Sequence, residues 1–189
     1  MTTEEDIIKA CINGERKAQK ALYDKYAAKM LGVCLRYAKS FEEAEDVLQE
    51  AFLKVFSCIG QYRFEGSFEG WIRRVIVNTA LNSYRSNLKH NYNSSLEEQH
   101  QLSSDNISND AVGALTTEDL LKTIQSLPAG YRTVFNLYEI EGYKHKEIAE
   151  MLNISENTSK TQLLKAKAYI RGLLDKLMKL EQTKYKYDE

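Results

Sequence analysis

The sequence predicts an all-α protein made of two small helical domains joined by a flexible linker. One observation is the scarcity of helix breakers, because the 189 residues include only one proline, Pro128, and nine glycines. A second is that apolar residues recur at three- and four-residue steps in two long blocks. A third is the polar stretch 87–117 between the blocks, which is rich in Asn and Ser and poor in apolar residues.

The first block, residues 1–86, carries the periodicity of four helices. Ser40 precedes the acidic turn Phe41–Glu45, as expected of a residue that caps a helix N-terminus. Three glycines punctuate residues 60–70, which indicates a loop. The expected helices of this block are 4–13, 15–38, 41–56 and 69–85.

The second block, residues 118–181, contains a helix-turn-helix pattern, and residues 182–189 form a tail. In the segment 145–155, Asn153 stands where the chain must turn, and Asn tolerates the left-handed conformation. Ser155 can then cap a second helix through its hydroxyl. That helix carries the polar residues Lys160, Thr161, Gln162, Lys165 and Lys167, which could reach bases and phosphates in a major groove. The alternative is an ordinary helical hairpin with a solvated basic face.

Charge and cysteine content narrow the class of protein. The net charge is only −1, but acidic residues gather in 40–50 and basic residues in 160–179, so two surfaces could serve two partners. Three cysteines without a C-x-x-C spacing suggest reduced, packed thiols in a cytosol. The acidic N-terminus is unlike a signal peptide, and no apolar run is long enough for membrane insertion.

An acidic stripe is predicted on the helix 41–56. Its members, spaced at i, i+3, i+4 and i+7, are Asp46, Gln49, Glu50 and Leu53. Acid and amide groups beside one exposed leucine suggest docking onto a basic helical partner. The competing interpretation is a solvated helix face, because charge stripes are often only that.

Aromatic and basic residues gather in the segment 62–85. Tyr62, Phe64 and Phe68 offer rings on which unpaired bases could stack. On the following helix, one face is expected to hold Trp71, Arg74, Asn78, Leu81, Asn82 and Arg85, and the core face Ile72, Val75, Ile76 and Ala80. The alternative is that the aromatic residues, Trp71 above all, belong to the core.

An enzyme is disfavoured, and no cofactor is expected. Glu97 and His100 form a single E-x-x-H within the polar linker, without the second copy that a di-iron site needs. No phosphate-binding glycine loop or nucleophile elbow occurs. A helical metalloenzyme therefore ranks below a dimeric helix-turn-helix regulator, which in turn leaves the acidic stripe and residues 60–86 unexplained.

Three motifs in series resemble the extracytoplasmic-function (ECF) sigma factors of the sigma-70 family. The run AEDVLQEAFLKVF is similar to the region-two helix that docks on the clamp helices of the polymerase β′ subunit. FEGSFEGWIRRVIVNTALNSYR is similar to the promoter-melting segment, and LPAGYRTVFNLYEIEGYKHKEIAEMLNISENTSKTQLLKAKAYI to region four. The resemblance covers roughly residues 18–86 and 118–175.

This resemblance implies a cytoplasmic transcription-initiation subunit, not an enzyme, with region two in 1–86 and region four in 118–181. Its partners would be core RNA polymerase (β′ clamp helices and β flap), promoter DNA and an anti-sigma factor. Residues implied in polymerase binding are Asp46, Gln49, Glu50 and Leu53. Those implied at the −10 element are Tyr62, Arg63, Phe64, Phe68, Arg74, Asn78, Asn82 and Arg85. Those implied at the −35 element are Lys160, Thr161, Leu164, Lys165 and Lys167. The chain departs from the family at Asn82, where many members have Asp, and at Lys160 and Lys165, where Arg is common.

Overall fold

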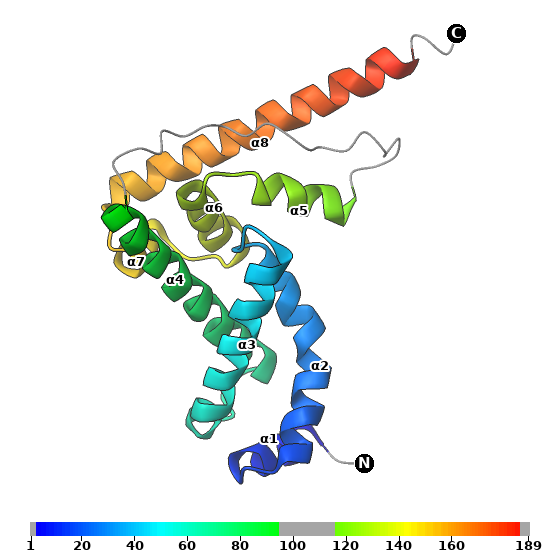
Figure 1. Cartoon of the computed structure of the whole chain (residues 1–189), viewed down its shortest axis with the longest axis vertical. Coiled ribbons are helices and arrows are strands. Elements are labelled where there is room, and N and C mark those ends of the chain that lie inside the picture. The colour runs from blue at the N-terminus through cyan, green and yellow to red at the C-terminus, as the bar shows by residue number, and fades with distance from the viewer. Residues whose placement is uncertain (1–2, 95–115, 186–189) are drawn as a thin grey trace. The chain divides into compact units, whose positions relative to one another are not determined.

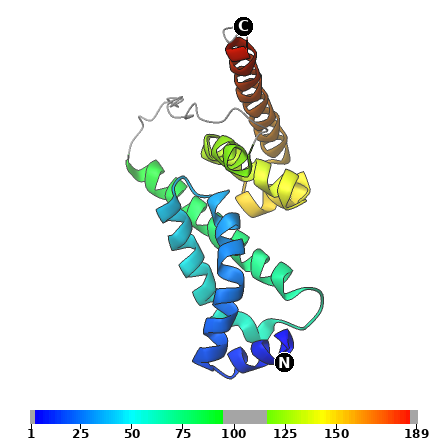
Figure 2. The same ribbon diagram turned by 90° about the vertical axis from the view of Figure 1, so that its right-hand side faces the viewer.

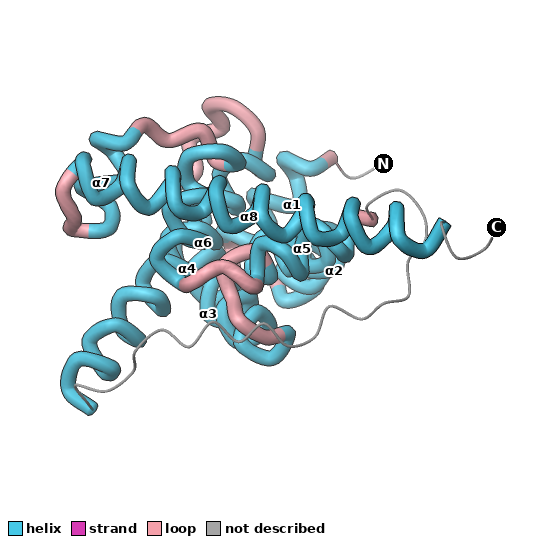
Figure 3. Tube along the Cα trace, turned by 90° about the horizontal axis from the view of Figure 1, so that it is seen from above, coloured by secondary structure: helices cyan, strands magenta, loops and turns pink. Residues whose placement is uncertain are grey.

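The computed structural model describes residues 3–94 and 116–185 as helices and loops, without a strand in these ranges (Figure 3). This confirms the predicted all-α class. The chain divides into two compact units, Met1–Ser86 and Asn87–Glu189. No helix in the described ranges is both long and apolar enough to span a bilayer.

The first unit is built on two long helices that run side by side in opposite directions, α2 and α3 (Figures 1 and 2). Between them they bury apolar side chains such as Leu22, Met30 and Phe52, and α4 adds Ile72 and Ile76 to the core. The elements are α1 (Glu4–Ile12), α2 (Arg16–Leu35), α3 (Phe41–Cys58), the 3-10 turn η1 (Ile59–Gln61) and α4 (Phe68–Ser94).

The short helix α1 is fixed to α2 by polar contacts as well as by its buried side chains. Thr3 and Asp6 form a reciprocal capping box at its start. The Tyr26 hydroxyl donates a hydrogen bond of 2.5 Å to Glu4 Oε1, and the Lys25 ammonium also contacts this carboxylate. The hydrogen bond from Lys25, followed by that from Tyr26, lowers the pKa of Glu4, so the carboxylate stays charged near neutral pH. These contacts hold α1 against the rest of the unit.

The second unit consists of four shorter elements and the long helix α8. In chain order they are α5 (Thr117–Gln125), α6 (Ala129–Phe135), the π-helical turn η2 (Asn136–Ile140), α7 (His145–Leu152) and α8 (Glu156–Tyr185). Val134, Leu137 and Ile148 are completely buried at its centre. Gly142 adopts a φ of +78° after η2, and the Tyr143 N–H bonds the Leu137 carbonyl at 2.9 Å, which turns the chain into α7.

Helix ends differ from the expectation most where the polar linker begins. The linker was predicted over 87–117, but α4 continues to Ser94 and α5 begins at Thr117. The tail was predicted over 182–189, whereas α8 reaches Tyr185. Extending an existing helix needs no new nucleus, so a segment rich in Asn and Ser can continue a helix that its composition alone would not start.

Limited proteolysis tests the predicted separation of the two units. Because residues 87–117 are polar and poor in apolar groups, we expect the first cuts there, with two helical fragments remaining. The helical residues 87–94 should be cut more slowly than the rest of the linker. The measurement is mass spectrometry of the fragments with their circular dichroism. A linker as resistant as α2 would contradict this organisation.

Candidate functional site

The acidic stripe of α3 lies on the solvent side of that helix. Ser40 caps the helix, accepting a hydrogen bond of 3.2 Å from the Glu43 N–H, as the sequence predicted. Apolar residues on the other side of α3 are buried, among them Val47, Leu48, Ala51 and Val55. The stripe residues are all exposed: Asp46, Gln49, Glu50 and Leu53. Leu53 is 72% exposed, so an apolar side chain lies at the end of the polar stripe.

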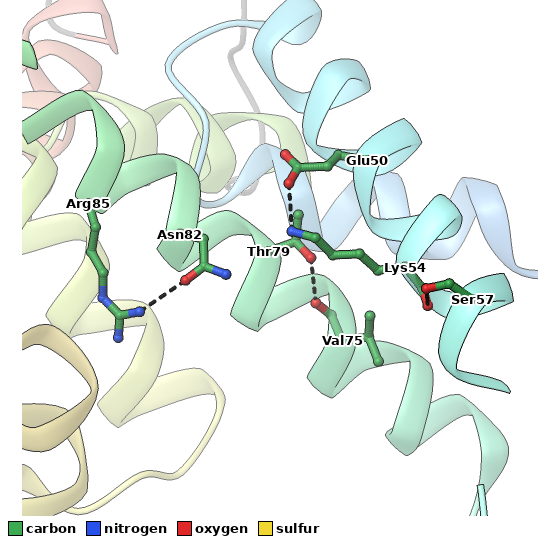
Figure 4. Close-up of polar contacts among 7 residues, drawn as sticks. All are labelled: Glu50, Lys54, Ser57, Val75, Thr79, Asn82 and Arg85. Carbon is green, nitrogen blue, oxygen red and sulfur yellow. Dashed lines mark hydrogen bonds and ion pairs between the residues drawn. The ribbon is translucent and has the colours of Figure 1, made fainter. Parts of the chain in front are cut away.

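The Glu50 carboxylate has an intramolecular partner within this surface. The Lys54 ammonium lies 2.5 Å from Glu50 Oε1, one helical turn away (Figure 4). Both side chains are well exposed, so the pair contributes only about 0.3–0.5 kcal/mol. A basic partner could therefore take over the Glu50 carboxylate at little cost.

Glu42 extends the acidic surface by one turn toward the helix N-terminus. It is exposed and stands four residues before Asp46, on the same side of α3. A hydrogen bond with its own backbone N–H, followed by one with Ser40, lowers the pKa of Glu42, which keeps it ionised. Sequence reasoning left Glu42 out of the stripe, although the i, i+4 spacing to Asp46 would have found it.

The aromatic residues of the segment 62–68 differ sharply in exposure. Tyr62 is 8% exposed and Phe68 only 2%, so both rings belong to the core of the first unit. Phe64 is 43% exposed, and its neighbour Arg63 is exposed as well. The rings of Phe68 and Trp71 stack with centroids 5.6 Å apart, which supports the alternative that Trp71 packs with the core.

Helix α4 presents a polar face that begins one turn after Trp71. Arg74, Asn78 and Asn82 are exposed, and Arg85 is half-buried. The Arg85 guanidinium donates a hydrogen bond of 3.0 Å to Asn82 Oδ1, as Figure 4 shows. A guanidinium beside two amides offers donors for both phosphates and base edges.

Leu81 was expected on this polar face, and that expectation is wrong. Its side chain is 1% exposed and packs in the core. At about 100° per residue, Leu81 lies roughly 60° away from Asn78, toward the buried side of α4.

The helix-turn-helix geometry of the second unit follows the sequence closely. Asn153 ends α7 in the left-handed conformation, with φ 54° and ψ 49°. The Ile154 N–H bonds the Ala149 carbonyl at 3.0 Å, which closes the turn. The Ser155 hydroxyl then accepts a hydrogen bond of 3.0 Å from the Thr158 N–H at the start of α8.

The first turns of α8 expose every residue predicted at the −35 element: Lys160, Thr161, Leu164, Lys165 and Lys167. Leu164 is 69% exposed, while Leu163 and Ala166 face the core. Lys160 pairs with Glu156 at 2.7 Å, and Lys167 pairs with Glu139 at 2.7 Å. The Lys165 ammonium lies 5.9 Å from the Tyr131 ring centroid. These partners are surface contacts that a phosphate could displace.

Ser159 joins the two helices of the motif through a contact that sequence reasoning missed. It is completely buried, and its hydroxyl lies 2.9 Å from His145 Nδ1 at the start of α7. The His145 ring also stacks on Tyr138, with centroids 4.4 Å apart and planes 22° apart. The buried hydroxyl of Ser159 is therefore satisfied by a polar partner.

We expect His145→Ala to lower the free energy of unfolding of the second unit by about 1–3 kcal/mol, because it removes a ring stack and leaves a buried hydroxyl without this partner. Hydrogen exchange of α7 and α8 in the full chain measures this loss. The adjacent exposed Lys146→Ala is the matched control and should have little effect. Equal protection in the two variants would contradict the role of His145.

Within the described ranges 3–94 and 116–185, no group of three or more His, Cys, Asp or Glu side chains is arranged to hold a metal ion. Glu97 and His100, the single E-x-x-H, lie outside these ranges. The three cysteines are free thiols, and burial raises the pKa of Cys34 to about 12, so this thiol stays protonated.

Comparison with family models and known proteins gives a consistent result. Residues 22–89 match Sigma-70 region 2, and residues 117–170 match Sigma-70, region 4. The RNA polymerase sigma-H factor of Pseudomonas aeruginosa is 28% identical over 95% of this chain and 98% of its own length. The ECF RNA polymerase sigma-E factor of Escherichia coli K12 is 27% identical over 94% of this chain and 97% of its own.

Among solved structures, the fold is similar to that of the Bartonella quintana sigma factor RpoE, crystallised with the anti-sigma factor NepR. The TM-score is 0.52 at 17% identity, over 82% of this chain and 96% of that one. The two matched regions follow one another in this chain as separate compact units.

Proposed function

Because this chain belongs to the sigma-70 family and is an ECF-type RNA polymerase sigma factor, we propose that three of its surfaces divide the work of promoter recognition. One surface on α3 docks core polymerase, one on α4 and its preceding loop engages the −10 element, and one on α8 reads the −35 element. The observation that carries the proposal is that region two and region four, in this order, coincide with two compact units that each present exposed polar side chains.

Polymerase docking is assigned to Asp46, Gln49, Glu50 and Leu53. These residues are exposed together on one side of α3, and Leu53 is not buried by any part of the first unit. This arrangement supports contact with a basic helical surface. The family resemblance points to the β′ clamp helices for this contact and to the β flap for region four.

Engagement of the −10 element is assigned to α4 and the 62–68 loop. Asn78 is exposed on the side of α4 that also carries Arg74 and Asn82, which supports base contact flanked by phosphate contact. Arg63 and Arg85 add positive charge for the DNA backbone. Tyr62 and Phe68 are buried, so their part in base binding would be to support the loop.

Reading of the −35 element is assigned to the exposed side of α8. Lys160, Thr161 and Lys165 can reach base edges or phosphates, and Leu164 can meet a thymine methyl group. Lysine gives a point charge in place of the planar arginine fork, so phosphate contact accounts for these lysines better than bidentate guanine recognition.

In this function the chain acts by binding, the polymerase performs the chemistry, and no cofactor is needed. The cytoplasm is the proposed location because polymerase and promoter are found there. An anti-sigma factor remains a proposed partner, suggested by the family resemblance.

In-vitro transcription tests the proposal as a whole. The purified chain is added to core polymerase with a pool of duplexes randomised around the −10 and −35 positions. We expect transcripts to start from a distinct subset of the pool only when the chain is present. Tight duplex binding by the chain alone, with no promoter-directed transcription, would instead favour the dimeric helix-turn-helix regulator.

A further inference from the structure

The lysines on the exposed side of α8 have acidic partners within the second unit. Lys160 pairs with Glu156 at 2.7 Å. Lys167 pairs with Glu139, also at 2.7 Å. With Lys165, these side chains carry three positive and two negative charges, a net charge of only +1. Because phosphate neutralisation supplies nearly all of the affinity for non-specific DNA, this surface should hold an arbitrary duplex only weakly.

The two acids come from different parts of the chain. Glu156 stands on α8 one turn before Lys160, at the i, i+4 spacing that is common on helix surfaces. Glu139 belongs to the π-helical turn η2 and precedes Lys167 by 28 residues. Helix periodicity therefore explains the first pair, whereas the second pair exists only because η2 packs beside α8.

The turn η2 holds Glu139 in a fixed place. The Glu141 N–H donates to the carbonyl five residues before it at 2.9 Å, which gives this turn one residue more than an α-helical turn. Leu137 is completely buried, and Tyr138 stacks on the His145 ring of α7 with centroids 4.4 Å apart. Because the residues just before Glu139 are anchored in this way, its carboxylate is held against α8.

A carboxylate in this place opposes the approach of DNA phosphates. The Lys167 side chain is 48% exposed and that of Glu139 is 33% exposed, so solvent reaches both groups and their pair contributes little to stability. A phosphate that approaches the Lys167 ammonium also approaches the Glu139 carboxylate, 2.7 Å from it, and the two anions repel each other. Glu139 thus offsets most of the attraction that Lys167 would exert on a duplex.

The side chains suited to reading bases lie on another part of the α8 surface. Thr161 and Leu164 are exposed, and at about 100° per residue they stand roughly 120° and 60° from Lys167 around the helix. Their contacts with base edges and thymine methyl groups are short-ranged, so the Glu139 carboxylate does not oppose them. A duplex held by base contacts can do without a phosphate at Lys167, whereas an arbitrary duplex has only phosphate contacts.

We propose that Glu139 is a specificity-determining residue, which pairs with Lys167 and thereby suppresses the binding of region four to arbitrary duplex DNA. This inference rests on the proposed function, because it takes the exposed side of α8 as the −35 surface. It deepens that function with a residue that lies outside α8 and repels DNA instead of binding it.

The test measures binding of the full chain, without polymerase, to two duplexes of equal length. One duplex carries the −35 element of a promoter that the wild-type holoenzyme selects from the randomised pool, and the other carries the same bases in scrambled order. Fluorescence anisotropy over a series of salt concentrations gives each Kd. We expect Glu139→Gln to lower the Kd of the scrambled duplex by about two- to fivefold at low salt. The Kd of the −35 duplex should fall less, so that the preference between the duplexes narrows.

The salt dependence provides a readout that a merely structural role would not change. Freeing the Lys167 ammonium adds about one phosphate contact, so the slope of log affinity against log salt should steepen by about 0.9 for the scrambled duplex. Glutamine keeps the size of the side chain at a half-exposed position, so the melting curve of Glu139→Gln should match that of the wild type.

Two further variants show whether Glu139 acts through Lys167. In a Lys167→Gln background, Glu139→Gln should change the scrambled-duplex Kd less than it does in the wild-type chain. Glu118→Gln is the matched control, because it also removes one carboxylate from a surface pair, with Lys122 at 2.9 Å on α5. This control should leave both Kd values unchanged.

Different results overturn the two levels of the proposal. An unchanged or higher scrambled-duplex Kd for Glu139→Gln, or an equal fall for both duplexes, overturns the specificity role of Glu139. An undiminished effect in the Lys167→Gln background overturns its action through Lys167. If the wild-type holoenzyme selects no promoter from the pool, the proposed function itself falls. If it selects promoters and only the Glu139 variants disagree, the −35 surface stands without this residue.

Discussion

Replacement of Glu50 by Lys is expected to weaken binding to core polymerase by about two orders of magnitude, because like charges facing each other in an interface cost several kcal/mol. The Glu50 carboxylate is exposed beside Gln49 and Leu53 on α3, where a basic partner surface would meet it. The change lies on the solvent side of the helix, so the circular dichroism spectrum should match that of the wild type. Titration of labelled core polymerase with the variant measures the loss.

A matched control separates docking from the loss of a surface ion pair. Asp24 on α2 pairs with Lys20 at 2.6 Å, one turn away, and its side chain is 56% exposed, close to the 53% of Glu50. Asp24→Lys should therefore disturb its helix as much as Glu50→Lys disturbs α3 and leave polymerase affinity intact. If both variants bind core polymerase like the wild type, α3 is not the docking surface.

Replacement of Asn78 by Ala is expected to abolish strand opening while promoter binding in the closed complex persists. Asn78 is exposed at the centre of the polar face of α4, where its amide can bond the edge of a flipped base. Without that bond, the few kcal/mol needed to unstack a base are no longer offset. Permanganate reactivity of −10 thymines reports opening, and a gel shift reports binding.

Lys165→Ala should affect the other step. Its exposed ammonium, near the Tyr131 ring in the free protein, would contact a phosphate of the −35 duplex. We expect lower promoter occupancy at high salt, partial recovery at low salt, and a salt dependence reduced by about one phosphate contact. If the promoter opens normally with Asn78→Ala, Asn78 does not make the proposed base contact. If Lys165→Ala leaves the salt dependence unchanged, Lys165 does not make the proposed phosphate contact.

Periodicity alone determined which sides of the helices face solvent. The spacing of Val47, Leu48, Ala51 and Val55 marked the buried side of α3, so the exposed position of Glu50 followed from 3.6 residues per turn. The turn of the helix-turn-helix was equally local, because Asn153 and Ser155 need only their own backbone to set the left-handed residue and the cap. Leu81 marks the limit of such reasoning, since it lies at the margin between the polar and buried sides of α4.

Tertiary structure decided which side chains with the same chemistry are accessible. Sequence offered Tyr62, Phe64 and Phe68 as equivalent rings, but only the packing of α4 against the rest of the unit buries two of them and leaves Phe64 exposed. The same holds for the contact between His145 and Ser159, which are fourteen residues apart and meet only because two helices cross. Local patterns fix helices and caps because their hydrogen bonds span a few residues. Exposure and partnership between helices depend on packing that no short stretch of sequence contains.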